Sequence, residues 1–164
     1  MNDEMNEKIN RKIQAKWREG YVVGHDCIAF GDGRVVIAST GSMYDPNNGE
    51  TEHFWVPLCD TTLTGMQKYQ EDLWTEVDIW HGPFEFENQK IVFGDGGMGN
   101  EGYVASVGAD NTLNWSMFFT FSNPINKAEM VDRQLICYGD TGMVITIDID
   151  ELTKVKVKFD DPFK

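Results

Sequence analysis

The chain has 164 residues, of which 41% are hydrophobic, so it can form one domain over residues 1–164 with a buried core and is not a disordered chain. Asp and Glu number 27 against 14 Lys and Arg, and the net charge of −13 argues against a nucleic-acid partner, because phosphate contacts need clustered cations. An acidic surface suits a basic protein partner, although it also serves solubility alone.

The cysteines and the lack of long apolar runs indicate a cytoplasmic protein. Cys27, Cys59 and Cys137 are odd in number and lie in or beside apolar runs, which favours reduced thiols over a disulfide framework. There is no N-terminal secretion signal, and no apolar run approaches the length that spans a bilayer. We therefore expect cytoplasmic localisation and no membrane partner.

Residues 1–20 predict an N-terminal helix that ends near Gly20. One apolar stripe recurs every four residues and consists of Met5, Ile9, Ile13 and Trp17. Such a stripe predicts packing on the protein's own body. A helix that docks on a partner is the alternative.

From Tyr21 onward the apolar period changes to that of β-strands, in three units over residues 21–58, 83–122 and 126–160. The units share one turn, which reads Phe30-Gly31-Asp32-Gly33, Phe93-Gly94-Asp95-Gly96 and Tyr138-Gly139-Asp140-Thr141. We expect glycine to provide a positive φ there and the aspartate to bond its own backbone. Each unit therefore predicts a meander of four antiparallel strands.

Over residues 21–159 these meanders resemble the blades of a β-propeller. The Trp-Asp and Gly-His pairs of the common regulatory propellers are absent, and three blades are fewer than a closed propeller has. We therefore expect a mostly β fold of three four-stranded, blade-like repeats with an N-terminal helix. The repeats could form an open stack, close by dimerisation, or build a barrel or sandwich, and the helix could cover one exposed edge.

Two segments interrupt the repeats. Residues 40–52 are rich in Gly, Pro and Asn and predict a polar loop, after which a fourth strand ends at Pro57. Residues 59–82 form an insert that we expect to be a short helix or an ordered loop laid on the β body, with an acidic outer face. Its apolar residues at helical spacing are Met66, Tyr69, Leu73, Val77 and Trp80.

The motifs that resemble ligand sites lack the context that such sites need. Residues 97–102 read G-x-G-x-x-G but lead into a strand instead of a helix, which favours a hairpin loop over a nucleotide site. His25, His53 and His81 are too far apart for a local metal motif. The carboxylates at 148–151 give an incomplete calcium loop and favour a solvated turn. We predict no cofactor and no metal.

Catalytic arrangements also find no support. The G-x-S-x-G motif is absent. Cys27 and His25 share a strand face by spacing, but a buried cysteine beside an exposed turn histidine is the favoured interpretation. The recurring aspartates Asp32, Asp95 and Asp140 are explained by turn geometry. We predict no catalytic residue and a protein that is not an enzyme.

The remaining signal is acidic charge beside aromatic residues. Residues 1–20 carry a net charge of +1 and the rest of the chain −14. Aromatic anchors with acidic neighbours are typical of an interface with a basic protein, although the same aromatics could pack inward while the acids are solvated. The partner-binding candidates are Tyr44, Asp45, Glu50, Glu52, Tyr69, Glu71, Asp72, Trp74, Glu76 and Asp78.

By size, acidity and lack of both a secretion signal and catalytic motifs, the chain resembles the immunity proteins of bacterial contact-dependent growth-inhibition and related polymorphic-toxin systems. The resemblance implies an acidic cytoplasmic protein that neutralises a cognate toxin domain, often a nuclease, by covering its basic active-site surface. These proteins share no motif, so the resemblance implies no site residue. The alternative function is a propeller-like protein-interaction subunit of a larger assembly.

Overall fold

The computed structural model describes residues 3–69 and 72–160, which form mostly antiparallel β-structure with two α-helices. In chain order the elements are α1 (Asp3–Arg18), β1 (Tyr21–Val23), β2 (Cys27–Phe30), β3 (Arg34–Asp45), β4 (Glu50–Thr62), α2 (Leu63–Tyr69), β5 (Trp74–Glu76), β6 (Asp78–Ile79), β7 (Phe84–Phe86), β8 (Gln89–Asp95), β9 (Gly102–Val107), the 3-10 turn η1 (Ala109–Asn111), β10 (Leu113–Phe119), β11 (Ile125–Val131), β12 (Gln134–Gly139), β13 (Met143–Asp148) and β14 (Val155–Phe159). The expected β class and N-terminal helix are confirmed.

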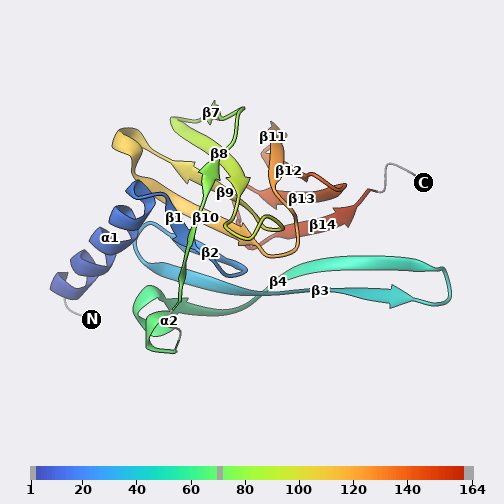
Figure 1. The fold of residues 1–164 in the computed structure, drawn as a ribbon, viewed down its shortest axis with the longest axis horizontal. Coiled ribbons are helices and arrows are strands. Elements are labelled where there is room, and N and C mark those ends of the chain that lie inside the picture. Colours follow the sequence, from blue (N-terminus) through green and yellow to red (C-terminus); the bar gives the residue numbers. More distant parts are fainter. Residues whose placement is uncertain (1–2, 70–71, 161–164) are drawn as a thin grey trace.

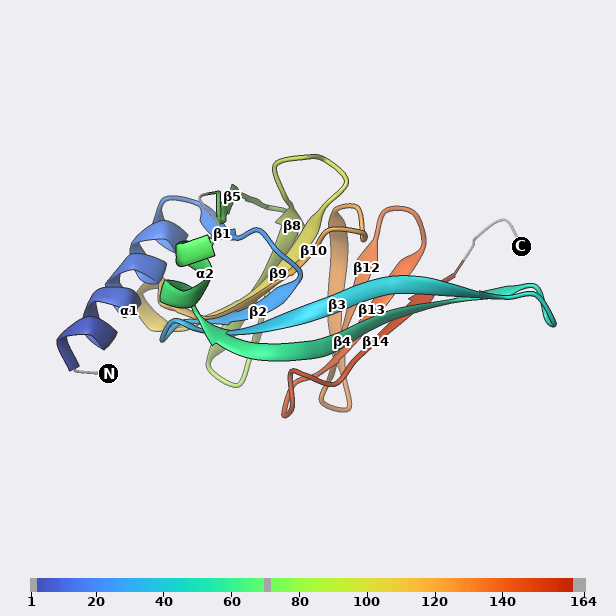
Figure 2. The ribbon, with the colours of Figure 1, turned by 90° about the horizontal axis from the view of Figure 1, so that it is seen from below.

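Twelve strands form one continuous sheet that curls into a half-barrel (Figures 1 and 2). Their order is β11-β12-β13-β14-β4-β3-β2-β10-β9-β8-β6, with β7 also paired to β8, while β1 and β5 form a separate pair. The expectation of three separate blades is therefore corrected: the described strands form one continuous sheet. Meanders join edge to edge where β14 pairs with β4 and β2 with β10, and β1 leaves the first unit to pair with β5.

The two faces of the sheet carry two cores. Side chains alternate across a strand, so Cys27 and Ala29 of β2 enter the core beneath the helices, whereas Ile28 between them enters the core inside the curl. The same alternation occurs in β8, where Val92 belongs to the first core and Phe93 to the second. Because the central strands are buried on both faces, their sequences are continuous apolar runs and do not alternate with polar residues.

Helix α1 packs on the end of β10. Ile13 and Trp17 are buried, which agrees with the expected stripe; the side chains of Met5 and Ile9 lie outside the description. The Gln14 amide is fixed by three hydrogen bonds, since its Nε2 donates to Gly31 O (3.2 Å) and Leu113 O (3.0 Å) and its Oε1 accepts from Leu113 N (2.8 Å). The described part of the stripe thus covers the protein's own body.

The repeated Gly-Asp turn proves to be a place where two chain segments cross. A Cβ on Gly31, Gly94 or Gly139 would lie 2.0, 2.0 or 2.3 Å from a carbonyl oxygen, that of Leu113, Asp78 or Ser122 respectively. None of these three glycines has a positive φ, so the expected reason is wrong for them; in the first copy the positive φ falls on Gly33 instead (φ +91°). At the three crossing positions, close backbone approach requires glycine.

The aspartates of the repeated turn have three different partners. Asp32 accepts from Arg34 N (3.0 Å), as expected for a turn that binds its own backbone. Asp95 instead accepts from Trp80 Nε1 (3.0 Å), and Asp140 accepts from Asn126 Nδ2 (2.6 Å). Two of the three aspartates therefore tie the crossing segment in place.

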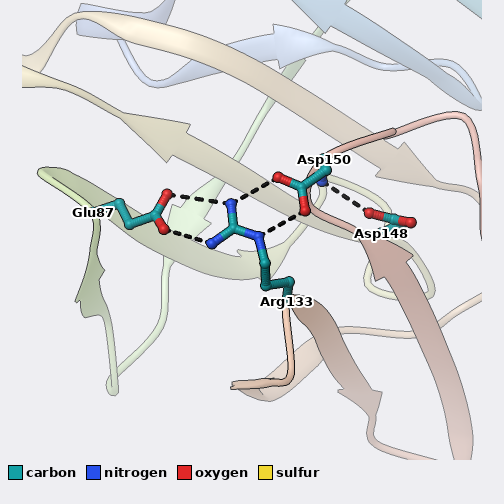
Figure 3. A network of polar contacts seen from close by, with 4 residues as sticks. All are labelled: Glu87, Arg133, Asp148 and Asp150. Carbon is teal, nitrogen blue, oxygen red and sulfur yellow. Dashed lines mark hydrogen bonds and ion pairs between the residues drawn. The ribbon is translucent and has the colours of Figure 1, made fainter.

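Arg133 joins three hairpin turns by ion pairs (Figure 3). Its guanidinium, in the β11–β12 turn, contacts Glu87 of the β7–β8 turn (2.5 Å) and Asp150 of the β13–β14 turn (2.6 Å). The hydrogen bonds from Arg133 lower the pKa of the Asp150 carboxyl below its ordinary value. Turns that are far apart in sequence are thereby linked across the two ends of the sheet.

Strands β3 and β4 form a hairpin far longer than the sequence predicted. Residues 40–52 were expected to be a polar loop, but they continue the two strands as far as the pair Asp45 and Glu50. Pro57 does not end β4. It pairs with Ala38, and Leu58 is the extra residue of a β-bulge, which accommodates the missing proline N–H.

The insert is helical only in its first part. Helix α2 covers residues 63–69, and residues 74–79 form the short strands β5 and β6. Leu73 and Val77 are nevertheless buried, in the core beneath the helices. The expected short helix in the insert is therefore confirmed at α2, whereas the helical spacing that was predicted to continue from Tyr69 to Trp80 is wrong.

Candidate protein-binding site

The outer part of the β3–β4 hairpin, residues 39–56, forms an arm that is packed on the body at its root and projects beyond it toward its tip (Figures 1 and 2). Strand β2 pairs with β3 only at residues 35–37, and β14 pairs with β4 at the single position Val157 to His53. The arm therefore exposes most of its surface to solvent.

The root of the arm is held by Asp26 and Trp55. Ala38 N donates to Asp26 O (2.9 Å), and the Asp26 carboxylate accepts from Thr40 Oγ1 (3.1 Å) and Thr120 N (2.9 Å). Trp55 is only 2% exposed and lies in the core inside the curl. These contacts fix the direction in which the arm leaves the body. The role of Asp26 could not be predicted from the sequence, because its partners Thr40 and Thr120 are remote along the chain.

The tip of the arm is a four-residue turn over residues 46–49. Gly49 has a φ of +71° and donates from its N to Asp45 O (2.8 Å). Asn47 N donates to Asp45 Oδ1 (2.9 Å), and Glu50 N donates to Asn48 Oδ1 (2.9 Å). Asp and Asn side chains that accept hydrogen bonds from nearby backbone N–H groups stabilise a defined turn, so the tip has one backbone conformation.

One face of the arm combines acids with apolar side chains. Strand alternation and the register place six residues on this acidic face: Met43, Asp45, Glu50, Glu52, Phe54 and Val56. Met43 is 63% exposed and Val56 46%. Phe54 lies over Gly41, where a Cβ would come 2.8 Å from its Cζ. The face therefore offers exposed apolar area with carboxylates at its outer end.

Two of the three carboxylates of the acidic face, those of Asp45 and Glu50, lie directly opposite each other. Asp45 pairs with Glu50, and the next pair on the same face joins Met43 to Glu52. Like charges directly opposite on neighbouring strands destabilise a hairpin. There is also no Lys or Arg between Arg34 and Lys68 in the sequence. A cation from another molecule would relieve this repulsion.

The structure brings together only part of the predicted set. Asp45, Glu50 and Glu52 gather on the acidic face, while Tyr44 points to the opposite face and is 66% exposed. Met43, Phe54 and Val56 were missed by the sequence analysis. The Pro-Asn-Asn-Gly turn between 45 and 50 is the signal that could have shown a hairpin there.

The second predicted segment lies at the other end of the molecule from the arm tip (Figure 1). Tyr69 is 82% exposed at the end of α2, and Glu71 lies outside the described residues. Trp74 is half-buried against the core, with Lys16 Nζ 5.8 Å from its ring centroid. The exposed acids of this segment are Asp72, Glu76 and Asp78. The two predicted segments therefore cannot form one surface.

Other sequence candidates occupy structural positions. Residues 97–102 connect β8 to β9 directly, which agrees with a hairpin loop. His53 lies on the arm with its ring centroid 6.1 Å from that of Phe159. Burial raises the pKa of the Cys27 thiol, which disfavours a nucleophilic thiolate. In residues 3–69 and 72–160, no three His, Cys, Asp or Glu side chains gather as a metal site would need.

Comparison with known proteins gives no relative for this chain. No family model, no curated protein and no solved structure matches it. Within the described part of the chain, neither helix has the length and apolarity needed to cross a membrane. The function is therefore inferred from the arm and its chemistry.

Proposed function

We propose that the chain is an acidic binding protein that neutralises a toxin domain, with a nuclease as the favoured class, by covering its basic active-site surface. The observation that carries this proposal is the acidic face of the arm. Asp45, Glu50 and Glu52 lie there on a hairpin that projects beyond the body toward its tip.

Electrostatics supports a basic partner. The repulsion between Asp45 and Glu50 destabilises the free arm and is relieved when a cation binds between them. A nuclease cleft is basic because it binds phosphates, and an acidic arm can occupy the same place. Met43 and Val56 add apolar contact area beside the charges, as the centre of a protein interface requires.

In this proposal the chain neutralises the toxin by occupying its active-site surface, and it catalyses no reaction. The chain acts as a cytoplasmic inhibitor, not as an enzyme, and requires no cofactor. The alternative is a propeller-like interaction subunit of a larger assembly, which one continuous sheet of the described strands supports less than separate blades would. The arm is the projecting surface on which both functions would bind a protein partner.

Co-expression with a candidate toxin tests the proposal. If the gene directly upstream encodes a large secreted protein, the C-terminal domain of that protein is the candidate. We expect the wild-type chain to protect cells from that domain and to inhibit its nuclease activity in a one-to-one complex. The variant D45K/E50K/E52K should fold and fail to protect. Full protection by this variant would contradict a role for the arm, and a toxic domain that the wild-type chain does not inhibit would contradict the function.

A further inference from the structure

Beyond its root, strand β3 has a free edge. On the side away from β4, its pairing with β2 ends at Ile37, and one further bond follows, from Ala38 N to Asp26 O (2.9 Å). In the described residues, no other strand pairs with this side of β3. Residues 39–45 therefore present an unpaired strand edge along the arm.

The direction of the free backbone groups follows from the alternation of a strand. Ala38 N points away from β4, so Thr40, Ser42 and Tyr44 direct their N–H and C=O groups to the same side. This agrees with the pairing of Ala38 to Pro57, which has no N–H to offer across the hairpin. The edge thus offers hydrogen-bonding groups from three alternate residues.

The two edges of the hairpin differ in their protection. The edge of β4 carries Glu50 and Glu52, then Pro57, a bulge at Leu58 and finally Asp60, all of which oppose the addition of a strand. Residues 38–44 of β3 contain no charge, no proline and no bulge. Unprotected edges of this kind pair with other chains.

We propose that this edge of β3 pairs with the same edge of a second copy of the chain, antiparallel and about a two-fold axis at Ser42. In that register Ser42 opposes Ser42 of the second copy and exchanges two backbone hydrogen bonds with it, while Thr40 opposes Tyr44 on each side. A β-branched residue opposite an aromatic is a favourable cross-strand pair.

The charges on the arm are compatible with this register. Asp45 of one copy opposes Ser39 of the other, so no carboxylate faces another across the new pair. Both acidic faces remain uncovered, because strand pairing uses the edge and not a face of the hairpin. The net charge of −13 on each copy opposes association, so salt strengthens the dimer by screening. This inference is independent of the proposed toxin partner.

Sedimentation velocity on the full chain, over a series of protein and salt concentrations, tests the proposal. We expect the wild-type chain to form a dimer whose association constant rises with salt. Ser42→Pro removes the Ser42 donor of both copies without removing a donor to β4, and should lower this constant roughly tenfold to a hundredfold. Ser42→Ala keeps the donor and should leave it unchanged. A wild-type chain that stays monomeric throughout, or equal constants for the two variants, would overturn the proposal.

Hydrogen exchange gives a second readout that needs no substitution. The amides of residues 40, 42 and 44 should become protected as the protein concentration rises, whereas those of 41 and 43, which face β4, should be protected throughout. Protection of residues 40, 42 and 44 that does not depend on concentration would also overturn the proposal.

Discussion

At Gly31, Gly94 and Gly139, a single missing side chain permits two backbone segments to cross. The repetition of the Gly-Asp turn was visible in the sequence, but its reason was not, because a local pattern indicates turn geometry and cannot show which distant carbonyl lies nearby. The oxygen of Asp78 occupies the space above Gly94, and β6 is a strand that the sequence analysis did not predict.

Substitution of Gly94 by alanine should destabilise the fold by about 1–3 kcal/mol or more, because its Cβ would lie 2.0 Å from the Asp78 carbonyl oxygen. Gly97→Ala is the matched control, since the nearest atom to its Cβ would be 3.7 Å away. Urea unfolding of both variants measures the difference. Equal stability of the two variants would show that the backbone at the Gly94 crossing can shift to accommodate a Cβ at little cost.

The three cysteines should differ sharply in reactivity with a thiol reagent. Cys59 is exposed, whereas Cys27 and Cys137 are buried, and burial raises the pKa of the Cys137 thiol to about 12. We expect one thiol to react in the native protein at neutral pH and the other two only after unfolding. Cys59→Ser should abolish the native reaction. Rapid labelling of more than one thiol would contradict the burial.

Among the elements, the arm is the longest segment that sequence reasoning missed. The apolar alternation that reveals a strand arises where one face is buried, and residues 40–52 have both faces in solvent. The core strands were predictable because burial leaves a strong apolar signal, as at Ile91, Val92 and Phe93. The acids of the arm could be predicted as a candidate surface, but their placement on one face depends on the hairpin register, which a bulge at Leu58 sets.

Arg133 should stabilise the closure of the curled sheet, because it links three hairpins. We expect Arg133→Gln to lower Tm more than the control Lys154→Gln, since Lys154 pairs with Glu151 inside one turn. Both effects are small, because the groups are exposed. Differential scanning calorimetry measures both, and equal effects would contradict a role in closure.

The effect of Arg133 should also depend on pH. Since the native pKa of Asp150 is lowered, its contribution is fully present above its unfolded pKa and is lost as the pH falls through the native pKa. The difference in Tm between the wild-type chain and Arg133→Gln should therefore shrink below about pH 4. A difference that grows with acid would show that another group dominates.

For the whole molecule, the order of strands decides the shape, and it follows from contacts that are remote in sequence. Strand β14 meets β4, and β2 meets β10, so the meanders fuse into one sheet instead of stacking as blades. No local pattern encodes those two pairings. The same order leaves β3 and β4 at the middle of the sheet, with their outer halves projecting as the arm.

The central claim, that the acidic face of the arm binds a basic toxin domain, is tested most directly by the rate at which the two associate. Stopped-flow measurement should compare D45N/E50Q/E52Q with the control E85Q/D110N/D132N, which removes three exposed charges from the body. We predict that the arm variant associates with the upstream-encoded domain about tenfold more slowly at low salt and loses most of its salt dependence, while the control keeps both. Equal rates and salt dependence for the two variants would contradict the claim.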